Sequence, residues 1–389
     1  MSETRNIRPV LFIDNYFPVI DGVTETVHEY ARHMNCPVVC PAMESRYLEK
    51  NDFPYEVLTS FTLRAPFTRY ASAAPKLDPK LAGRIAAKNP DIFHIHSPSL
   101  LGEYAARLGK KTGIPVVATF HSKYYDAIYE FTKSRTISKM VTDRIVKVFE
   151  SCDEVWACSE ETGETLRSYG YTKPYYVMPN GTDVTVPDNT EELKERAASV
   201  YQIPREKHVL LFVGQQIWYK NQRLILDTFR LLCDRSNDWY LIMAGSGKDE
   251  KEIEQYAASL NLSDHVLFTG LIKDRDLLKG VYLNADLLFF PSVFDNAPLV
   301  LREAAVLGVP TLATEGSNAA GAIRKNMNGF TASATPKDMS HEIMRIFTEE
   351  DVKQIGRAAR DTIPLSWEEL IPMVLEEYRK VIDQYGRTR

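Results

Sequence analysis

Short apolar runs alternate with amphipathic segments along most of the chain. Strand-like runs cover residues 9–14, 91–96, 114–120, 154–159 and 175–180, and then 208–214, 240–245, 265–270, 286–292 and 309–314. Most are continuously apolar, as expected of strands that are covered on both faces. Amphipathic segments such as 22–34 and 248–260 lie between them. This repeated β-α-β order predicts an α/β fold with doubly wound parallel sheets.

The alternation is interrupted once, at residues 182–208, where the chain is polar and contains two prolines. A chain of 389 residues is too long for one ordinary core, so we expect two domains, residues 1–190 and 191–366, joined near this segment. Parallel α/β sheets bind ligands at the carboxyl ends of their strands. Functional residues are therefore expected in the loops that follow strands, around a cleft between two Rossmann-like domains.

A short helix is expected after the strand-like run 286–292. It ends at Gly308 and Pro310. Asp295 or Asn296 is expected to cap it, and Pro298 is tolerated in a first turn. Its start would then lie at the carboxyl end of a strand, where free N–H groups suit an anion such as pyrophosphate. The residues expected to offer these groups are Asn296, Ala297, Leu299 and Val300.

Two acids eight positions apart, Asp295 and Glu303, accompany this helix. Glu303 lies one turn deeper and could accept two hydrogen bonds from a ribose diol, while Asp295 could hold a sugar hydroxyl. The alternative is that Asp295 only caps the helix and that Glu303 is a solvated helix residue. The spacing of the two acids leaves both interpretations open.

Three further loops follow strand-like runs. Gly22 begins a predicted helix, so a phosphate could approach the backbone closely there. Gly245 and Gly247 lie in AGSGKDE, which lacks the third glycine of a dinucleotide fingerprint and the Ser or Thr of a P-loop, so we expect a structural turn. Lys220 lies near the start of a helix and could stabilise charge on a leaving diphosphate. An ordinary surface lysine is the alternative.

Three histidines lie close together in the predicted first sheet. His94 and His96 alternate along one strand and share a face, and His121 ends the next strand. A zinc site is an alternative for these three residues. No neighbouring acid or cysteine completes a ligand set, so we expect no metal. Instead, we expect His121 to offer a hydrogen bond to a ligand.

The segment 136–150 is amphipathic, with Lys139, Arg144 and Lys147 on its polar side. It could lie on an anionic membrane. The interpretation that we favour is a helix that faces the core with one side and exposes its basic side to solvent.

The composition argues against several classes of protein. The net charge is −5, which argues against a broad phosphate-binding surface and therefore against a nucleic-acid partner. The five cysteines form no CxxC pair. From the polar first residues and the lack of a long apolar run we expect neither a signal peptide nor a membrane span. These features predict a reduced, cytoplasmic protein.

Taken together and in order, the motifs resemble those of the retaining glycosyltransferases of family four. The resemblance runs essentially end to end. In the first half it rests on PVIDGVTETV, PDIFHIHSPSLLG, TFHSKYY, CSEETGETLRSYG and MPNGTDV. In the second half it rests on VGQQIWYKN, AGSGKDEKEIE, FTGLI, NADLLFFPS, the two acids, GVPTLATEGSNAAGAI, NGF and SWEELIPMVLEEYRKVI.

This resemblance implies the GT-B fold, in which two Rossmann-like domains face a central cleft. Residues 1–190 would form the acceptor side and residues 191–366 would bind the nucleotide-sugar donor. In the family the last helix crosses back onto the first domain, so residues 367–389 are expected to join it, with Trp367 at the crossing.

The resemblance also implies roles for individual residues. Glu303 corresponds to the second acid of the Glu-x7-Glu motif, which binds the ribose. Asp295 stands at the first acid, normally a glutamate that holds the donor sugar. Lys220 matches the diphosphate-binding lysine, Gly22 the glycine loop beneath the diphosphate, and His121 the histidine at the reaction centre. His121, Lys220 and Asp295 are the expected catalytic residues.

Three departures from the family pattern affect the expected donor site. Gln215 stands where the family usually has a second diphosphate-binding residue, an arginine. The first acid is shortened to Asp295, and residues 296–298 replace a Gly-Phe-Gly segment. Residues 317–322 replace a GG-x-P-E turn. The altered loops would face the sugar.

We therefore expect a retaining hexosyltransferase that uses a nucleotide diphosphate sugar as co-substrate, with a UDP-sugar favoured over a GDP-sugar. No metal or other cofactor is expected, because Lys220 and the helix start would take the place of a divalent cation. The acceptor would be a sugar, a lipid or a small molecule. One alternative is a non-catalytic nucleotide-sugar-binding partner or sensor, motivated by Gln215; another is a sugar-nucleotide epimerase of the same fold.

A lesser alternative is a lipid glucosyltransferase of the diacylglycerol type. It rests on the segments HSPSLLG and TFHSKYY and on DGVT near the start of the chain. In that case residues 61–70 would form part of a lipid-facing surface, and the protein would make a peripheral contact with the inner face of the membrane.

Overall fold

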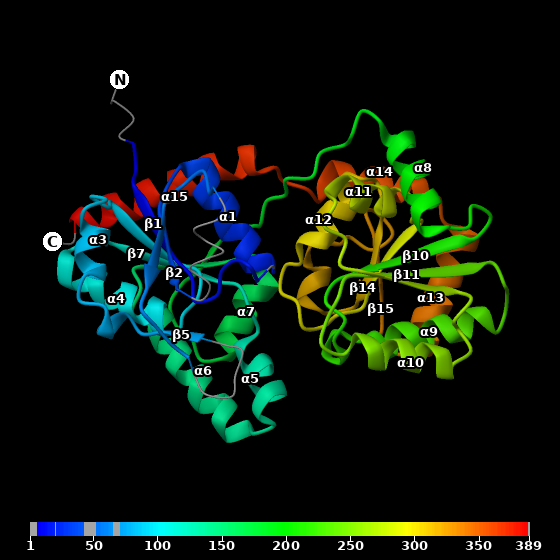
Figure 1. Cartoon of the computed structure of the whole chain (residues 1–389), viewed down its shortest axis with the longest axis horizontal. Helices are drawn as coiled ribbons and strands as arrows, with labels where there is room; N and C mark the ends of the chain where they lie inside the picture. Colours follow the sequence, from blue (N-terminus) through cyan, green and yellow to red (C-terminus); the bar gives the residue numbers. More distant parts are fainter. Residues whose placement is uncertain (1–5, 20, 43–51, 65–70, 388–389) are drawn as a thin grey trace. The chain divides into compact units, whose positions relative to one another are not determined.

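The computed structural model describes residues 6–19, 21–42, 52–64 and 71–387, and the chain divides into two compact units (Figure 1). Unit 1 comprises Met1–Gly181 and Trp367–Arg389, and unit 2 comprises Thr182–Ser366. The chain enters unit 2 and leaves it at neighbouring points, because the backbone N–H of Thr182 donates to the carbonyl of Leu365 at 2.9 Å.

Unit 1 is built on a seven-stranded sheet whose strand pairs are all parallel, in the order β3-β2-β1-β6-β7-β8-β9. The strands are β1 (Pro9–Phe12), β2 (Val38–Pro41), β3 (Val57–Ser60), β6 (Ile92–Ile95), β7 (Val116–Phe120), β8 (Glu154–Ala157) and β9 (Tyr176–Val177). A separate antiparallel pair consists of β4 (Thr62–Arg64) and β5 (Ala71–Ala73).

The strands of unit 1 are connected and covered by helices. These are α1 (Gly22–Met34), α3 (Leu81–Ala86), α4 (Leu100–Thr112), α5 (Tyr124–Thr132), α6 (Arg135–Glu150), α7 (Glu160–Ser168) and α15 (Trp367–Arg387), with a 3-10 turn η1 (Pro75–Leu77). The right-handed crossovers that such helices make are what allow consecutive strands to lie parallel in one sheet.

Helix α15 belongs to unit 1 although it ends the chain. Tyr378 on this helix is fully buried, and its hydroxyl lies 2.5 Å from Nδ1 of His94 on β6. Its ring stacks on Trp156 of β8 with 5.3 Å between the centroids. Trp367 at the start of α15 is buried against Gly181, where a Cβ atom would lie only 2.5 Å from the indole ring.

Unit 2 contains a six-stranded parallel sheet in the order β12-β11-β10-β13-β14-β15. The strands are β10 (His208–Val213), β11 (Trp239–Ala244), β12 (Val266–Gly270), β13 (Leu287–Phe290), β14 (Thr311–Thr314) and β15 (Phe330–Ala332). The helices are α8 (Thr190–Tyr201), α9 (Gln222–Cys233), α10 (Glu250–Ser259), α11 (Arg275–Leu283), α12 (Leu299–Val306), α13 (Pro336–Glu349) and α14 (Val352–Thr362), with 3-10 turns η2 (Trp218–Lys220) and η3 (Asn318–Ala322).

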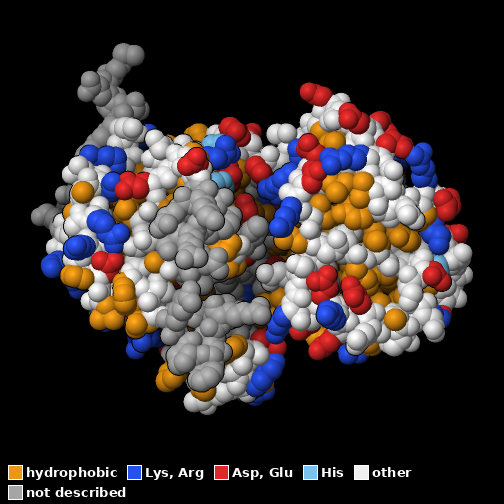
Figure 2. All heavy atoms as spheres, viewed as in Figure 1, with side chains coloured by type: hydrophobic (Ala, Val, Ile, Leu, Met, Phe, Trp, Pro, Cys, Tyr) orange, Lys and Arg blue, Asp and Glu red, His pale blue; other side chains and the backbone are white. Residues whose placement is uncertain are grey.

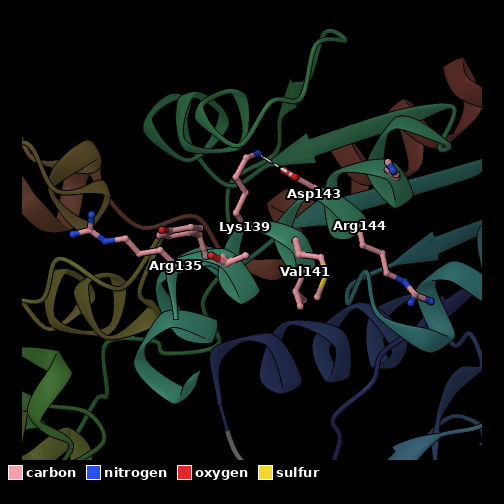
Figure 3. Close-up of a pocket in the computed structure, with 9 residues that line it drawn as sticks. Arg135, Lys139, Val141, Asp143 and Arg144 are labelled. Carbon is pink, nitrogen blue, oxygen red and sulfur yellow. Dashed lines mark hydrogen bonds and ion pairs between the residues drawn. The ribbon is translucent and has the colours of Figure 1, made fainter. Parts of the chain in front are cut away.

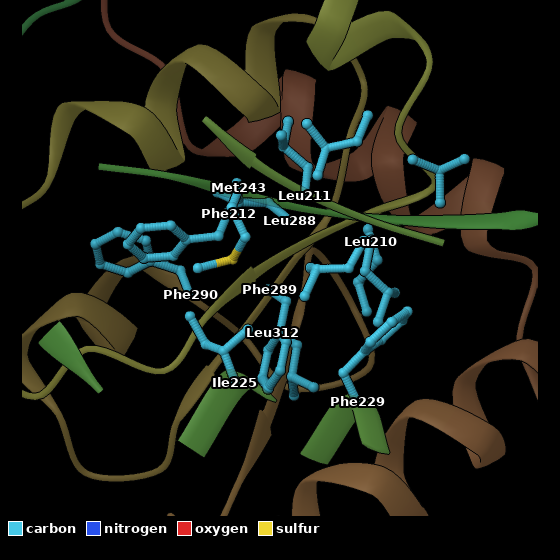
Figure 4. Packing of buried hydrophobic residues seen from close by; sticks show 14 of the residues in the cluster. Leu210, Leu211, Phe212, Ile225, Phe229, Met243, Leu288, Phe289, Phe290 and Leu312 are labelled. Atoms are coloured by element: carbon cyan, nitrogen blue, oxygen red, sulfur yellow. The ribbon is translucent and has the colours of Figure 1, made fainter. Parts of the chain in front are cut away.

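The core of unit 2 lies on both faces of its central strands (Figure 4). Leu210, Leu211 and Phe212 of β10 are successive residues and are all fully buried, so both faces of this strand are covered. Phe212 stacks on Phe290 of β13 at 5.8 Å, and Phe229 of α9 packs in the same cluster. This two-sided burial explains why the strand sequences are continuously apolar. The expectation of doubly wound parallel sheets is confirmed.

Basic and acidic side chains are interspersed on the face shown in Figure 2, with no continuous field of one sign among the residues drawn in colour. None of the helices in the described part of the chain is both long and apolar enough to span a bilayer.

Candidate functional site

The strand order of unit 2 locates a ligand-binding edge. Counted along the chain, the six strands follow the order 3-2-1-4-5-6, which reverses between β10 and β13. In sheets of this kind the loops at the carboxyl ends of the two central strands diverge and leave room for a ligand. Lys220 follows β10 and Asp295 follows β13, so both expected site residues lie at this reversal.

Lys220 and Asp295 form an ion pair across this point. Nζ of Lys220 lies 2.5 Å from Oδ1 of Asp295, and Oδ2 of Asp295 accepts a hydrogen bond from the Ser292 hydroxyl at 2.6 Å. The two charged side chains are 16% and 20% exposed. The loops are also joined by Asn221, whose side-chain amide donates to the carbonyl of Pro291 at 2.8 Å. The interpretation of Lys220 as an ordinary surface lysine is therefore wrong.

Helix α12 begins without a side-chain cap. Its N-cap position is Pro298, which makes no capping hydrogen bond through its side chain. The expectation that Asp295 or Asn296 caps this helix is wrong, because Asp295 is held by Lys220 and Ser292 and the side-chain oxygen of Asn296 accepts from Asn318 at 2.8 Å. The first backbone N–H groups of a helix have no intrahelical acceptor, so the start of α12 remains suited to an anion.

The four residues expected to offer these N–H groups divide into two pairs. Leu299 and Val300 form the first turn of α12, whereas Asn296 and Ala297 precede the helix in the loop after β13. Asn296 is buried at 4% exposure. All four nevertheless lie within one short segment that begins next to Asp295 in the sequence.

Glu303 lies one turn into α12 and is buried, with 9% of its surface exposed. Tyr282 on α11 donates a hydrogen bond from its hydroxyl to Oε2 of Glu303 at 2.8 Å. Nη1 of Arg275, at the start of α11, lies 3.8 Å from Oε1, and Nη2 of Arg275 lies 3.0 Å from Asp183. The interpretation of Glu303 as a solvated helix residue is therefore wrong.

The environment of Glu303 has opposing effects on the pKa of its carboxyl. Burial raises the pKa of Glu303 above its ordinary value and is the largest effect, and the negative charge of Asp183 adds to it. The Tyr282 hydrogen bond and the positive charge of Arg275 oppose this increase. Tyr282 and Arg275 were not expected from the sequence, because Tyr282 has the spacing of a core residue and only its contact with Glu303 reveals its role.

The loop between β10 and η2 packs tightly on the loop after β11. A Cβ atom on Gly245 would lie 2.1 Å from the carbonyl oxygen of Gly214, and one on Gly247 would lie 2.3 Å from that of Gln216. The expected structural role of Gly245 and Gly247 is thus confirmed. Gln215 in the same loop has an exposed side chain, and its carbonyl accepts from Gln222 at 2.9 Å.

Gly22 and His121 lie in unit 1, each after a strand of the seven-stranded sheet. Gly22 is the first residue of α1, and the Asp21 carboxylate caps that helix by accepting from the N–H groups of Val23 and Thr24 at 3.0 and 2.8 Å. A negative side chain therefore already occupies the helix start where a phosphate was expected to approach.

His121 contacts two buried neighbours. Its Nε2 lies 2.9 Å from Nδ1 of His96, and its Nδ1 lies 3.7 Å from Sγ of Cys158. Burial lowers the pKa of His121 to about 3, so the ring is neutral at physiological pH. Burial also lowers the pKa values of His94 and His96.

The zinc alternative does not fit these histidines. Both ring nitrogens of His94 have partners within hydrogen-bond distance, Tyr378 at 2.5 Å and Thr119 at 2.7 Å. Neither nitrogen of His94 is therefore available to a metal ion, and no group of three or more potential ligands occurs among the residues that the structure describes.

Comparison with known proteins identifies two family matches that together span most of the chain. Residues 20–186 match the model of Glycosyltransferase Family 4, and residues 194–362 match that of Glycosyl transferases group 1. The chain is 22% identical over 314 residues to the alpha-monoglucosyldiacylglycerol synthase of Streptococcus pneumoniae, an alignment that covers 78% of this chain and 70% of that protein.

A second relative matches over a greater length. The GDP-mannose-dependent alpha-mannosyltransferase of Corynebacterium glutamicum is 21% identical over 394 residues, which covers 98% of this chain and 91% of the relative. Among solved structures, HepE of Anabaena in complex with UDP has a TM-score of 0.76 at 16% identity and covers 96% of this chain and 100% of its own. This similarity shows that the chain has the fold of GT-B glycosyltransferases.

Proposed function

Because the chain belongs to the glycosyltransferases of family 4, we propose that it transfers a hexose from a nucleotide diphosphate sugar to an acceptor hydroxyl, with retention of the anomeric configuration. The observation that carries this proposal is the set of groups at the strand-order reversal of unit 2: Lys220, the uncapped start of α12 and the buried Glu303. Together they offer a cation after β10, and an electropositive helix end and a diol acceptor on α12, which follows β13.

Each group has a role that its chemistry supports. Lys220 and the first N–H groups of α12 bind the two phosphates and stabilise the negative charge that develops on the leaving diphosphate. Glu303 accepts hydrogen bonds from the ribose hydroxyls, and Asp295 accepts from hydroxyls of the donor sugar. His121 lies in unit 1 and would contact the sugar at the reaction centre. Because cationic and N–H groups already neutralise the diphosphate, no divalent cation is required.

Retention follows from attack on the face that the diphosphate leaves. The acceptor oxygen forms a bond to the anomeric carbon as the bond between that carbon and the phosphate oxygen breaks. The acceptor's proton passes to the leaving phosphate oxygen, so no enzyme nucleophile is needed. This step rests on membership of the family.

We propose a UDP-sugar as donor. Support comes from HepE, whose solved structures include complexes with UDP and with UDP-glucose. The mannosyltransferase of Corynebacterium glutamicum is GDP-mannose-dependent, so GDP-sugars are the first competitors to test. Asn296 and Asn318 are hydrogen-bonded and lie in the two loops whose sequences depart from the family pattern. We propose that these loops together select the sugar.

Nucleotide release tests the proposed function without knowledge of the acceptor. The purified protein is incubated with UDP-, GDP- and ADP-sugars in the presence of EDTA. We expect slow hydrolysis of one donor and its loss in Lys220→Ala and Glu303→Ala. Lys353→Ala and Glu254→Ala remove exposed side chains of the same types on α14 and α10 and serve as matched controls.

The same experiment distinguishes the proposed transferase from the main alternative, a protein that binds a nucleotide sugar without catalysis. If no donor is hydrolysed but calorimetry shows that one of them binds, the protein is a non-catalytic nucleotide-sugar-binding partner or sensor, or an enzyme that acts only with its acceptor. If no nucleotide or nucleotide sugar binds, the proposed site is wrong.

A lipid acceptor is the second candidate function, and the surface of α5 and α6 favours it. Phe131 on α5 is 82% exposed and Met140 on α6 is 64% exposed. Met140 lines an open depression together with the basic side chains of Arg135, Lys139 and Arg144 (Figure 3). The alpha-monoglucosyldiacylglycerol synthase similarity is consistent with such an acceptor. Residues 65–70 of the expected lipid-facing segment 61–70 lie outside the described residues.

A further inference from the structure

The ion pair between Lys220 and Asp295 occupies the position that the proposed function assigns to the donor diphosphate. Oδ1 of Asp295 lies 2.5 Å from the Lys220 ammonium, which is the cation expected to bind the phosphates. Oδ2 is held at 2.6 Å by the Ser292 hydroxyl. The carboxylate therefore has one oxygen on the proposed phosphate-binding cation and one on a neutral donor.

Burial explains why the two side chains pair. With only 16% of its side chain exposed, Lys220 has lost much of its hydration, and a desolvated cation is costly without a counter-ion. Asp295 supplies that counter-ion from the neighbouring loop. Asp295 is available to pair with Lys220 because α12 begins at Leu299 and Asp295 does not cap it.

A bound diphosphate changes this balance. Its oxygens carry more negative charge than one carboxylate and compete for the same ammonium protons. Asp295 then lies beside a like charge, which disfavours its position. A nucleotide sugar compensates, because its sugar hydroxyls can donate to the displaced carboxylate. Free nucleoside diphosphate has no such hydroxyls at that place and leaves Asp295 without a new partner.

We propose that Asp295 is an internal counter-ion of Lys220 that makes the site discriminate between the intact donor and the free nucleoside diphosphate product. The inference rests on the proposed function and extends it. Asp295 holds Lys220 before the donor arrives, moves to the sugar when the donor binds, and returns to Lys220 when the sugar has been transferred, so that it weakens retention of the product.

Calorimetry with Asp295→Asn tests this proposal, because asparagine keeps the shape and removes the charge. UDP and the UDP-sugar, or the pair of the base that the donor panel selects, are titrated into the full-length protein. We expect the Kd of free UDP to fall by about tenfold in the variant, since a competing negative charge is gone. The Kd of the nucleotide sugar changes less, because loss of a sugar contact offsets the gain.

Two further sets of variants test whether the effect on UDP binding is specific to the pair of Asp295 and Lys220. Asp264→Asn neutralises an exposed aspartate before β12, at the opposite edge of the sheet, and should leave both Kd values unchanged. In the background of Lys220→Ala, the effect of Asp295→Asn on UDP binding should shrink, because the two charges then no longer compete for one cation.

The possible outcomes distinguish a failure of the counter-ion proposal from a failure of the proposed function. If Asp295→Asn binds UDP as well as or less well than the wild type, the counter-ion proposal is overturned while the proposed function stands. If the wild type binds neither nucleotides nor nucleotide sugars, the proposed function fails first. Unfolding of the variant is recognised by its melting curve, and Asp295→Ser, which also removes the charge, then replaces it with the same expected gain in UDP affinity.

Discussion

Single side chains around Glu303 determine whether its carboxyl is ionised. The carboxyl is buried between α11 and α12 and has Tyr282, Arg275 and Asp183 as its polar and charged neighbours. Burial raises its pKa, and a raised carboxyl pKa means that the folded protein binds a proton more tightly than the unfolded chain. The contribution of this group to stability is therefore complete below the unfolded pKa of about 4.3 and is lost as the pH rises through the folded pKa.

Replacement of Glu303 by glutamine removes this pH-dependent cost. We expect Glu303→Gln to melt at the same temperature as the wild type near pH 4 and about 2–4 °C higher at pH 8, the shift that about 1 kcal/mol produces in a domain of this size. Donor binding should be weakened strongly at the same time, because glutamine replaces one of the two carboxylate acceptor oxygens with an NH2 donor and no longer offers a separate acceptor to each hydroxyl of the diol. Melting curves from pH 4 to 8 and calorimetry measure both effects. A lower melting temperature at pH 8 would contradict the assigned direction.

Tyr282 provides a second residue-level prediction. Its hydrogen bond stabilises the ionised carboxylate, so Tyr282→Phe should raise the pKa of Glu303 further. The fall in donor affinity at low pH should then begin at a higher pH, because the carboxyl takes up its proton earlier as the pH falls. Calorimetry across pH measures this shift.

The chain offers a matched control for Tyr282. Tyr256 on α10 donates to Asp227 on α9 at 2.5 Å in the same unit. Tyr256→Phe should cost stability without displacing the pH dependence of donor binding. Equal displacement by both variants would mean that Tyr282 has only a structural role.

At the scale of elements, the loop after β10 and the loop after β11 pack on each other through their backbones. Gly247 approaches Gln216 so closely that an alanine Cβ would lie 2.3 Å from its carbonyl oxygen. Gly247→Ala must therefore displace the loop that leads to Lys220, with a loss of about 1–3 kcal/mol of stability and weaker UDP binding. At Gly83 in α3 a Cβ would meet no atom within 4 Å, and Gly83→Ala should be neutral or stabilising. Undiminished UDP binding by Gly247→Ala would show that the two loops are independent.

The elements were largely predictable from the sequence, whereas the contacts between them were not. Ten strand-like runs correspond to ten strands, because buried parallel strands leave a continuous apolar signal. Strands β2, β3, β4, β5 and β15 were not expected, since runs of four or fewer residues are as compatible with a loop or a helix turn. The sequence placed Glu303 on the helix after β13 and Asp295 in the loop before it, but it gave Asp295 a capping role that the structure does not show. Asp295 pairs with Lys220 instead of capping α12. This pair forms because two loops that are distant in the sequence meet in the fold, and local sequence does not encode that meeting.

At the scale of the molecule, the end of the chain is part of the core of unit 1. Tyr378 stacks on Trp156 and contacts His94, so Tyr378→Ala should destabilise unit 1 by about 3–5 kcal/mol. UDP binding by unit 2 should be unaffected under conditions where unit 1 remains folded. Met373 on the same helix is 40% exposed, and Met373→Ala is the control that should change neither. Calorimetric melting and UDP titration of the same samples test this; loss of both properties would mean that the units unfold together.

The distribution of charge over the molecule gives the last prediction. Residues 100–150 contain nine basic and five acidic residues although the whole chain has a net charge of −5. Within this segment α6 buries Ile145 and Phe149, as expected for a core-facing helix, and its exposed side carries Arg135 and Lys147, which form no ion pair among the described residues. An anionic membrane surface complements such a combination of exposed apolar and basic side chains.

We therefore expect the protein to sediment with vesicles that contain anionic lipid and not with neutral ones. Each basic residue near such a surface contributes about 1 kcal/mol, so Arg135→Glu with Lys147→Glu should reduce binding at least about tenfold. Phe131→Ser with Met140→Ser should weaken it through lost apolar burial. Lys353→Glu with Met327→Ser changes exposed residues of unit 2 in the same way and is the control. Because Phe131, Arg135, Met140 and Lys147 are not among the residues proposed to bind the donor or to act at the reaction centre, the α5–α6 variants should retain donor hydrolysis in the absence of lipid. Equal binding to neutral vesicles, or none to either kind, would direct the search for the acceptor to water-soluble compounds.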